Sequence, residues 1–229
     1  MKKIIVISGG SSGLGKGAAE LLTKEHAVVL LSQDVSGLER AAKEIGCESE
    51  ACNVTNAAQV DAAISAIIGR HGRIDVLLNN AGVFTEGNIE DVPAETLKTV
   101  IDVNVTGAML LARAVVPYMK KQGSGLIINT VSQAGLTAKA GRTAYNTSKW
   151  AMTGFTKSLE LELAPHHIRV TGIYPGKIDT PLFQNSGLAR KMDTSDALTV
   201  QDVAETLIFI VSRPEHVAIP ELGIKHIEG

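Results

Sequence analysis

The sequence contains few aromatic residues, few cysteines and little net charge. Phe, Trp and Tyr make up only 3% of the 229 residues, so the core must be built mainly from Ala, Val, Ile and Leu, within an apolar content of 45%. This content is high enough for folding by burial and excludes a chain that is disordered throughout. The 22 basic and 24 acidic residues leave a net charge of −2. A nucleic-acid-binding protein is therefore not expected, because such proteins usually show a basic excess or a basic stripe.

The cysteines, histidines and apolar stretches of the sequence indicate neither a disulfide framework, nor a metal site, nor a membrane-spanning segment. Cys47 and Cys52 are too few for a disulfide framework and are expected to be structural thiols in a reducing cytoplasm. The six histidines lack zinc-ligand spacing, so no metal site is predicted. The longest uncharged stretch, residues 122–138, is interrupted by Gly, Ser, Asn and Thr, and the apolar run near the start is only four residues long. Neither a membrane-spanning helix nor a signal peptide is expected, and a soluble cytoplasmic protein is predicted.

Short apolar runs rich in β-branched residues alternate with stretches that are typical of helices. The strand-like runs are residues 4–7, 27–31, 74–78, 126–131 and 168–174, with a weaker one at 48–53. The helical stretches are residues 14–24, 35–45, 57–70, 93–120 and 143–163. Runs that are apolar throughout suit strands buried on both faces, and this alternation predicts a parallel sheet covered by helices on both sides. No linker or low-complexity tract interrupts the series, so residues 1–229 are predicted to form one doubly wound α/β domain.

The first predicted strand is followed by a turn rich in glycine. It reads Ser8-Gly9-Gly10-Ser11-Ser12-Gly13-Leu14-Gly15 and leads into the first helix. Glycines let a pyrophosphate approach backbone N–H groups, and the N-terminus of the following helix carries partial positive charge. The spacing differs from the commoner dinucleotide fingerprint, and Lys16 does not complete a triphosphate-binding loop. The turn therefore favours nucleotide binding over a plain βα turn, without identifying the nucleotide.

A tyrosine and a lysine lie four residues apart in the predicted helix 143–163. Tyr145 and Lys149 therefore share one face of the helix, about one turn from each other. A nearby ammonium favours the phenolate and lowers the pKa of a tyrosine from about 10, which suits proton exchange with an alcohol oxygen. Ser132 is expected at the end of the preceding strand, at the carboxyl edge of the sheet where open α/β folds bind ligands.

These patterns together resemble the single-domain branch of the short-chain dehydrogenase/reductase family, from Lys3 to about Thr180. Five motifs occur in the order that the family has. They are the glycine turn, Asn79-Asn80-Ala81-Gly82, Asn104 in Asn-Val-Thr-Gly, Ser132 with Tyr145 and Lys149, and Pro175-Gly176-Lys177-Ile178-Asp179-Thr180. The resemblance implies a Rossmann fold with about seven parallel strands and a nicotinamide cofactor.

The resemblance also implies a role for each motif residue. Tyr145 would be the general acid in carbonyl reduction and the base in alcohol oxidation, and Ser132 would hold and polarise the substrate oxygen. Lys149 would lower the pKa of the tyrosine and bind the nicotinamide ribose, while Asn104 would hold a water that links Lys149 to solvent. The cofactor-binding residues that the resemblance implies are Gly9, Ser11, Ser12, Gly13, Leu14, Gly15, Ser32, Gln33, Asn53, Val54, Asn80, Ala81, Gly82, Tyr145, Lys149, Pro175, Gly176, Ile178 and Thr180.

Two regions depart from the family pattern. Asn53 stands where the family usually has an aspartate near the adenine, and we expect its amide oxygen to accept a hydrogen bond from the adenine amino group. Residues 216–226 lack the common Asp-Gly-Gly ending and are more similar to a subgroup of NADP-dependent hydroxy-acid and amino-acid side-chain dehydrogenases. Residues 182–198 are a candidate substrate lid. Arg142, Arg190 and Lys191 are expected to be solvated surface charges.

The end of the second predicted strand determines the expected cofactor. NAD-preferring relatives carry an acidic residue there, which binds the ribose hydroxyls and repels a 2′-phosphate. Here the position is occupied by Ser32, which carries no charge, and Gln33 follows where NADP-preferring relatives often have arginine. Asp34 would oppose the phosphate if the turn folded it inward. NADP(H) is the expected cofactor, with NAD as the alternative.

The predicted function is an NADP(H)-dependent interconversion of a carbonyl and a secondary alcohol on a small substrate, with hydroxy acids among the candidates. The alternatives are a 3-oxoacyl-carrier-protein reductase, an NAD-preferring alcohol dehydrogenase and, from another class, a non-catalytic nucleotide-sensing protein. The two long helices 93–120 and 143–163 carry apolar residues on more than one face, including Met109, Val115 and Trp150. A homodimer or homotetramer that pairs these helices is therefore expected, with neither nucleic acid nor membrane as a partner.

Overall fold

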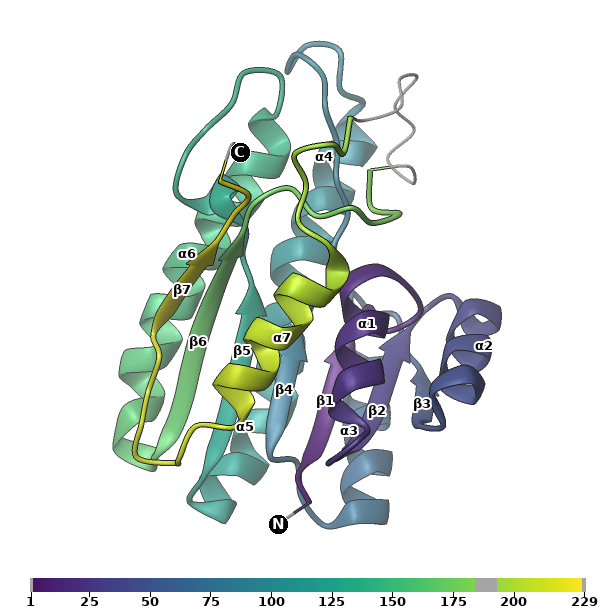
Figure 1. Cartoon of the computed structure of the whole chain (residues 1–229), viewed down its shortest axis with the longest axis vertical. Helices are drawn as coiled ribbons and strands as arrows, with labels where there is room; N and C mark the ends of the chain where they lie inside the picture. The colour runs from purple at the N-terminus through teal and green to yellow at the C-terminus, as the bar shows by residue number, and fades with distance from the viewer. Residues whose placement is uncertain (1, 184–192, 228–229) are drawn as a thin grey trace.

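Seven strands form a single parallel sheet in the computed structural model, which describes residues 2–183 and 193–227 (Figure 1). The order of the strands across the sheet is β3-β2-β1-β4-β5-β6-β7. The order reverses between β1 and β4, and an open α/β sheet binds its ligand beyond the carboxyl ends of the strands at such a point. The strands are β1 (Ile4–Ser8), β2 (Ala27–Ser32), β3 (Glu48–Ala51), β4 (Val76–Asn79), β5 (Gly125–Thr130), β6 (Ile168–Pro175) and β7 (Glu221–Ile224).

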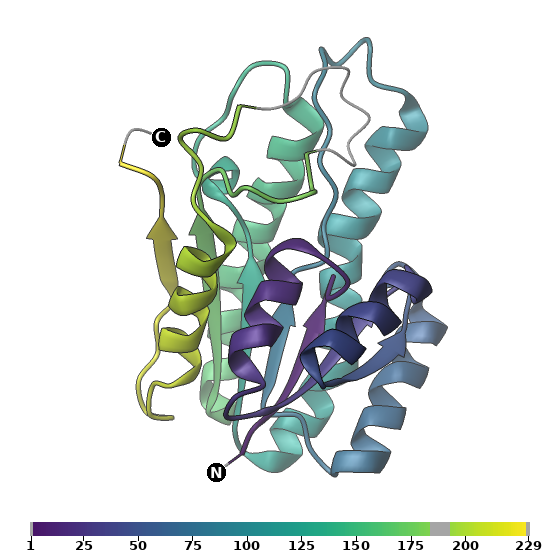
Figure 2. The ribbon, with the colours of Figure 1, turned by 45° about the vertical axis from the view of Figure 1, so that its right-hand side comes forward.

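Helices cover both faces of the sheet, as Figure 2 shows in the turned view. One face packs against α1 (Gly13–Leu22), α2 (Val35–Ile45) and α7 (Val200–Val211). The other face packs against α3 (Ala57–His71), α5 (Gly107–Gln122) and α6 (Thr143–Leu163). The remaining helical segments are α4 (Ala94–Ile101), the π-helical η1 (Asp102–Thr106), and the 3-10 turns η2 (Gln133–Gly135) and η3 (Ala164–His166).

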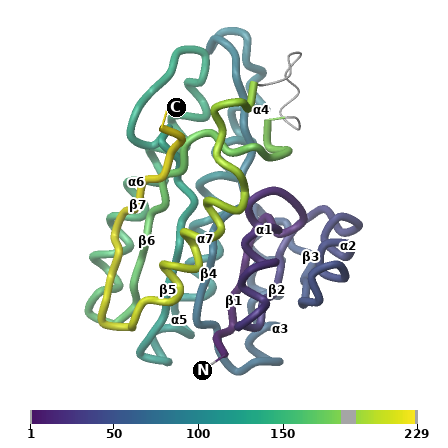
Figure 3. Tube along the Cα trace, viewed as in Figure 1, coloured from purple at the N-terminus to yellow at the C-terminus, as the bar shows by residue number. Residues whose placement is uncertain are grey.

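Alternation along the strands divides the core into two layers. In β1, Ile5 and Ile7 belong to the layer beneath α1 and α7, whereas Val6 belongs to the layer beneath α3 and α5. All three side chains are fully buried. Because successive strand residues point to opposite faces, a strand covered on both sides must be apolar throughout. The trace in Figure 3 follows the resulting path of the chain from β1 outward to β3 and back to β4.

The segments α4, η1 and α5 form one continuous helix over Ala94–Gln122, interrupted by the π turn. By length and composition this helix could cross a membrane, contrary to the expectation from the sequence. Its residues Leu111, Val115 and Met119 are nevertheless buried against the sheet. Because a core helix passes the same test of length and composition, the helix is explained by its packing and is only weak evidence of a membrane.

The structure agrees with most predicted elements and adds helix α7 and strand β7, for which no residue range was predicted. The helices predicted at 35–45 and 143–163 have the bounds of α2 and α6. Helix α7 was not predicted, although Thr199 and Asp202 form a capping box at its start, which is a recognisable N-terminal signal. Strand β5 ends at Thr130, so Ser132 lies two residues beyond the strand and not at its end.

Candidate active site

A cavity of about 760 Å³ opens at the carboxyl ends of the strands. Of the residues predicted to bind a cofactor, all but Gly15 line it, as does Ser132. Gly15 has another role: a Cβ there would lie 2.3 Å from the Gly9 carbonyl oxygen, so its glycine allows α1 to pack closely on the turn. Asn104 does not line the cavity either, because it is buried beneath it.

The glycine turn forms the floor of the cavity between β1 and α1. Gly9 and Gly13 have φ values of +68° and +54°, which side chains other than glycine adopt only with strain. A Cβ at Gly9 would also approach the Ala81 Cα within 2.9 Å. Both conformation and space therefore require glycine at position 9.

The N-terminus of α1 has the properties of an anion-binding site. Helices α2, α3 and α7 are capped by the side chains of Asp34, Asn56 and Thr199, whereas Ser12 makes no capping hydrogen bond at α1. Ser12, Gly13 and Leu14 line the cavity, so the first N–H groups of α1 face it. These groups and the helix dipole fit the pyrophosphate of a dinucleotide.

Tyr145 and Ser132 both line the other end of the cavity. Tyr145 is 8% exposed, and its ring packs edge-on against Phe84 with 4.8 Å between the centroids. Burial raises the pKa of Tyr145, which the hydrogen bond to Ser132 and the charge of Arg142 lower only in part. Ser132 has a φ of 113°, a strained value for a residue with a side chain, and such strain is often found at active sites.

Lys149 lies beside Tyr145 on α6, with its Nζ 5.7 Å from the centre of the tyrosine ring. Nζ donates a hydrogen bond of 3.0 Å to the carbonyl oxygen of Thr130. Burial lowers the pKa of Lys149 to about 8. The predicted lowering of the Tyr145 pKa by Lys149 is not found, because desolvation of the phenol is the largest influence and Lys149 is not among the groups that lower it.

Asn104 joins three segments beneath the catalytic pair. In the π turn η1, its Oδ1 accepts from the N–H of Val83 at 2.7 Å, and its Nδ2 donates to the Val83 carbonyl at 2.9 Å. Nδ2 also donates to Ser148 Oγ at 3.0 Å, and Ser148 in turn donates to the Tyr145 carbonyl at 2.7 Å. Asn104 therefore fixes the loop after β4 to the helix that carries Tyr145.

Polar side chains also tie the loop after β4 to the glycine turn. Ser8 Oγ accepts from the N–H groups of Asn80 and Ala81 at 3.0 and 3.1 Å. Deeper in the sheet, Asn79 donates to Asn129 at 2.9 Å. These buried bonds hold the switch point between β1 and β4 in one arrangement, since buried polar groups are costly unless they are satisfied.

The end of the cavity beyond β2 and β3 is built from uncharged groups. Ser32 Oγ donates to Ser11 Oγ at 3.2 Å and accepts from the Asp34 N–H at 3.1 Å. The Asp34 carboxylate is turned toward α2, where it accepts from the Gly37 N–H at 3.1 Å. Asn53 Oδ1 accepts from the N–H and the hydroxyl of Thr55. An adenine amino group that bonds to this oxygen, as predicted, would therefore share it with the Thr55 N–H or displace the Thr55 hydroxyl.

Several cavity residues were not predicted from the sequence. Phe84 follows the Asn-Ala-Gly motif but carries no signal of its own, and it contacts Tyr145. Arg142 was expected to be a solvated charge; it instead lines the cavity, pairs with Glu86 at 3.1 Å and lies over the Phe84 ring. Arg190, Lys191 and most of the predicted lid at 182–198 lie outside the described residues.

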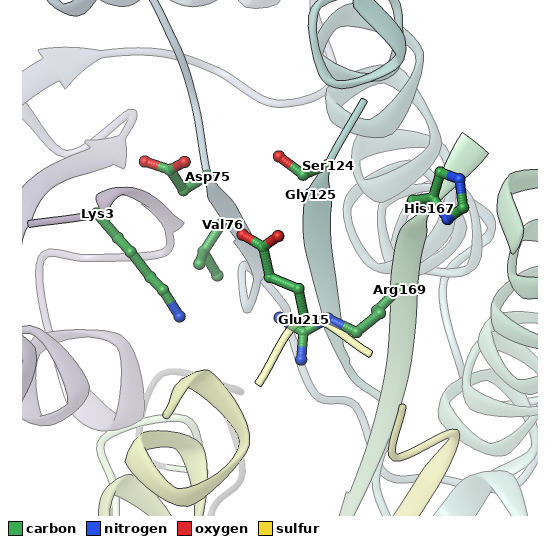
Figure 4. A pocket seen from close by; sticks show the side chains of 8 residues that line it. All are labelled: Lys3, Asp75, Val76, Ser124, Gly125, His167, Arg169 and Glu215. Carbon is green, nitrogen blue, oxygen red and sulfur yellow. The ribbon is translucent and has the colours of Figure 1, made fainter. Parts of the chain in front are cut away.

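A second cavity lies at the amino ends of the strands, opposite the large one, and is far smaller, about 20 Å³ (Figure 4). It is lined by charged side chains including Lys3, Asp75, Arg169 and Glu215. Arg169 donates there to the Val217 carbonyl at 3.0 Å, a bond that anchors the segment before β7. This volume suits a single water and not a substrate. Within residues 2–183 and 193–227, no cluster of His, Cys, Asp and Glu side chains could hold a metal ion.

Comparisons with known proteins agree with this geometry. Residues 3–191 match the family model for short chain dehydrogenase. The trans-4-hydroxycyclohexanecarboxylate dehydrogenase of Sinomonas cyclohexanicum is 34% identical, over 92% of this chain and 86% of that protein. The alcohol dehydrogenase of the archaeon Thermococcus sibiricus, solved with 5-hydroxy-NADP, superimposes with a TM-score of 0.91 at 25% identity, over 100% of this chain and 98% of that one. The 3-ketoacyl-(acyl-carrier-protein) reductase of Brucella melitensis, solved with NADH, has a TM-score of 0.91 at 31% identity, over 98% and 97% of the two chains.

The sheet, the glycine turn and the buried tyrosine together define a dinucleotide-binding oxidoreductase of the NAD(P)-dependent class. The chain belongs to the short-chain dehydrogenase/reductase family. The predictions of family, fold and enzyme class are confirmed, and so is a nicotinamide cofactor.

Proposed function

We propose that the protein uses NADP(H) to interconvert a carbonyl and a secondary alcohol on a small substrate. The observation that carries this proposal is that Tyr145, Ser132 and Lys149 line one end of a cavity whose floor is the glycine turn, with Tyr145 and Lys149 buried there. Because burial raises the pKa of Tyr145, the phenol keeps its proton at neutral pH. It can therefore protonate a carbonyl oxygen as that oxygen gains negative charge.

Each side chain of the catalytic group has a separate task in this mechanism. The cofactor, when bound, supplies or accepts the hydride. Ser132 donates a hydrogen bond to the substrate oxygen, and Tyr145 gives that oxygen a proton in reduction or removes one in oxidation. Lys149, whose Nζ lies 5.7 Å from the centre of the Tyr145 ring, would bind the nicotinamide ribose and so orient the cofactor beside the phenol. Asn104 has one lone pair that Val83 does not use, and it would hold the water that links Lys149 to solvent.

The preference for NADP(H) is supported by the groups beyond β2. A 2′-phosphate would meet the hydroxyls of Ser11 and Ser32, which are 3.2 Å apart and carry no charge. Asp34, the acidic side chain at this end of the cavity, is turned to cap α2. A hydroxyl can donate to a phosphate oxygen, whereas an acid at position 32 would repel it.

Hydroxy acids and their oxo forms are the substrates that the lining favours. Lys139 and Arg142 line the substrate end of the cavity; because Arg142 is paired with Glu86, Lys139 is the positive side chain that would attract a carboxylate. The relative from Sinomonas cyclohexanicum is named for a hydroxy acid of this kind. A second candidate, reduction of 3-oxoacyl-carrier-protein, is favoured by the similarity to the Brucella melitensis reductase.

A non-catalytic nucleotide sensor is the alternative from another class. Such a protein would need the dinucleotide cleft but not the proton-transfer group. Tyr145 and Lys149 are both buried at the cavity, and burying a lysine is costly unless it serves a purpose. The presence of both side chains argues for an enzyme.

Assembly into a dimer or tetramer is proposed from the outer faces of the long helices. Met109 on α5 and Trp150 on α6 are 49% and 52% exposed, and Leu161 is 77% exposed. Large apolar side chains on two neighbouring helices fit a contact with a second copy of the chain. Val115 and Met152 are buried within the subunit and take no part in this face. Light scattering at micromolar concentration should return at least twice the mass of the chain, and a monomer mass would refute the contact.

A cofactor-consumption screen tests the proposed function. NADPH and NADH are each offered with ketones, aldehydes, 3-oxo esters and oxo acids, and NADP+ and NAD+ with hydroxy acids. We expect turnover of at least one carbonyl class, with a higher kcat/KM for NADPH than for NADH. A higher kcat/KM with NADH would refute the cofactor preference, and cofactor binding without any turnover would favour the sensor.

A further inference from the structure

We propose that Arg142 and Glu86 are positioning residues for the proton transfer. Their ion pair fixes Phe84 against the ring of Tyr145 and so holds the phenol in one place in the cavity. The inference rests on the proposed function, because it takes Tyr145 as the residue that exchanges the proton. It gives Arg142 a task other than binding the substrate.

The ion pair between Arg142 and Glu86 is shielded from solvent. Nε and Nη2 of Arg142 donate to the same oxygen, Glu86 Oε2, at 3.2 and 3.1 Å. The two side chains are 22% and 18% exposed, and among the ion pairs within the described parts of the chain no other has both partners below a quarter. Water screens such a pair less than it screens exposed pairs, which usually contribute little. The pair therefore restrains the two segments that carry it.

Helix capping does not explain an arginine at position 142. Arg142 is the N-cap residue of α6, three positions before Tyr145, and its side chain makes no capping hydrogen bond. A positive charge at the N-terminus of a helix is unfavourable, because the helix dipole is positive there. The first turn of α6 contains no acidic residue that would offset this charge. The carboxylate of Glu86, in the loop after β4, offsets it instead.

Phe84 lies between the ion pair and the phenol. The guanidinium of Arg142 lies over the Phe84 ring, 5.2 Å from its centre, and the ring meets that of Tyr145 edge-on with 4.8 Å between the centroids. Phe84 is buried. A cation over an aromatic face and an edge-on pair of rings are both attractive contacts. A displaced guanidinium would therefore release the ring on which Tyr145 packs.

The loop that carries Phe84 is held on both sides of that residue. Before it, Asn104 bonds to the N–H and the carbonyl of Val83 at 2.7 and 2.9 Å. After it, next to the ion pair, the N–H of Gly87 donates to the carbonyl of Gly141 at 2.7 Å. The ion pair and this backbone bond together fix the second side of the loop to the start of α6, so that Phe84 is confined between two anchored points.

Steady-state kinetics with a substrate from the screen test this role. Arg142→Met removes the charge and keeps an apolar stem, and we expect kcat to fall by about tenfold, because a small displacement of a reacting group is costly. The KM values for the substrate and for NADPH should stay within about threefold, since the pair holds neither molecule. Arg142→Lys keeps the charge and should recover kcat to within about threefold of the native value. Arg70→Met is the matched control, because it breaks the ion pairs of Arg70 with β3 outside the cavity, and it should keep native kcat and KM.

Three outcomes of these measurements would overturn the inference. The first is a native kcat in Arg142→Met. The second is a raised KM for an acidic substrate with a native kcat, which would assign Arg142 to the substrate. The third is a loss in Arg142→Lys that equals the loss in Arg142→Met, because the charge would then not matter.

Double variants test whether the residues act through one another. Glu86→Gln alone should lower kcat about as far as Arg142→Met, and the double variant should lie within about threefold of the lower single one. In a Phe84→Leu background, Arg142→Met should lower kcat by less than about threefold. A further tenfold loss in either double variant would show that Arg142 acts independently of Glu86 or of Phe84, and would overturn the inference.

Nuclear magnetic resonance of the tyrosine rings gives a readout that does not depend on turnover. The chain contains three tyrosines, and the Tyr145 signal is the one that is lost in Tyr145→Phe. With carbon-13 at the ring carbon that bears the hydroxyl, Arg142→Met should shift the Tyr145 signal and leave those of Tyr118 and Tyr174 in place, whereas Arg70→Met should move none.

An unmoved Tyr145 signal in Arg142→Met would overturn the inference. If Arg142→Met does not fold, Glu86→Gln replaces it, with the same expected shift and the same refuting result. A screen without any turnover would refute the proposed function, whereas the comparison of the tyrosine signals would still decide whether the ion pair fixes the phenol.

Discussion

The two ends of the large cavity are built in different ways. At the catalytic end, Asn104, Tyr145 and Lys149 are buried; hydrogen bonds fix the side chains of Asn104 and Lys149, and the Tyr145 ring packs against Phe84. At the other end, Gln33 is exposed and Ser32 and Asn53 are half-buried, and no Lys or Arg of the described chain lines it. Proton transfer requires groups held in one geometry in a dry environment. Recognition of a solvated nucleotide does not require such a rigid, dry environment. We therefore expect single substitutions at this end to change the cofactor preference.

The largest expected effect is at the catalytic end. Tyr145→Phe removes the proton donor and keeps the ring that packs against Phe84. We expect kcat to fall by at least about 10²-fold, because general acid catalysis contributes that much or more. The Kd for NADPH, measured by calorimetry, should stay within about threefold, because the far end of the cleft is untouched. Tyr118→Phe on α5 is the control and should keep native activity; near-native turnover by Tyr145→Phe would refute the mechanism.

The second prediction concerns the cofactor end. Ser32→Asp places a carboxylate beside Ser11, where it would repel a 2′-phosphate and bind ribose hydroxyls. The ratio of kcat/KM for NADPH to that for NADH should fall by at least about tenfold, while kcat with NADH stays near the native value. Ser65→Asp adds the same charge at an exposed position of α3 outside the cavity and should leave the ratio unchanged. An equal loss with both cofactors in Ser32→Asp would contradict the assignment of the phosphate to this position.

Lys149→Met tests whether the buried charge of Lys149 lowers the free energy of unfolding. The pKa of Lys149 is about 8 in the folded protein and about 10.5 in the unfolded chain, so below pH 8 the fold carries a buried charge. Between pH 8 and 10.5 the folded protein has lost this proton and the unfolded chain has not, so the native stability rises with pH.

The variant removes the buried charge at every pH. We therefore expect Lys149→Met to be about 1–2 kcal/mol more stable at pH 7 and much less active, since an unpaired buried charge costs more than its one hydrogen bond returns. This advantage should shrink as pH rises from 8 to 10.5, as measured by urea unfolding. Lys157→Met, at an exposed position of the same helix, should show no such gain. A Lys149→Met variant that is less stable at pH 7 would contradict the account.

The smallest predicted effect concerns Ser148, which supports the catalytic end from below. Ser148→Ala leaves one Asn104 Nδ2 hydrogen without its acceptor in a fully buried position. We expect a loss of about 1 kcal/mol in the free energy of unfolding and a fall of less than about tenfold in kcat. Ser158→Ala, on the exposed face of α6, is the matched control. Equal stability of the two variants would show that the bond from Asn104 does not contribute.

Much of the fold follows from patterns that the sequence displays directly. Apolar runs such as 4–7 and 27–31 predicted β1 and β2, and the family that the motifs indicated implied a sheet of about seven parallel strands, as the structure has. Helix α7 was not predicted because no strand-like run lies directly before it to continue the alternation of strands and helices. Its capping box at Thr199 was nevertheless a usable signal. The π turn at Asp102–Thr106 was not predicted either; it contains Asn104, which bonds to the loop after β4.

The site was predictable as a set of residues but not as a set of hydrogen bonds. The sequence predicted that Tyr145 lies one turn from Lys149. It does not show how deeply the phenol is buried, and burial decides that the pKa of Tyr145 is raised and not lowered. For Asn53 the residue type allowed either end of the amide to face the cavity. The bonds that its Oδ1 accepts from Thr55 could not be predicted either, because a bond of this kind is visible only in the folded turn.

The pH dependence of carbonyl reduction tests the central claim that Tyr145 provides the proton. The pKa of Tyr145 is raised above its usual value near 10, whereas that of Lys149 is about 8. With a substrate from the screen, we expect kcat/KM for reduction to be level across neutral pH and to fall only above about pH 10, where the phenol loses its proton. The residual activity of Tyr145→Phe should lack this fall. A fall centred near pH 8 that persists in Tyr145→Phe would show that another group, Lys149 first among them, provides the proton.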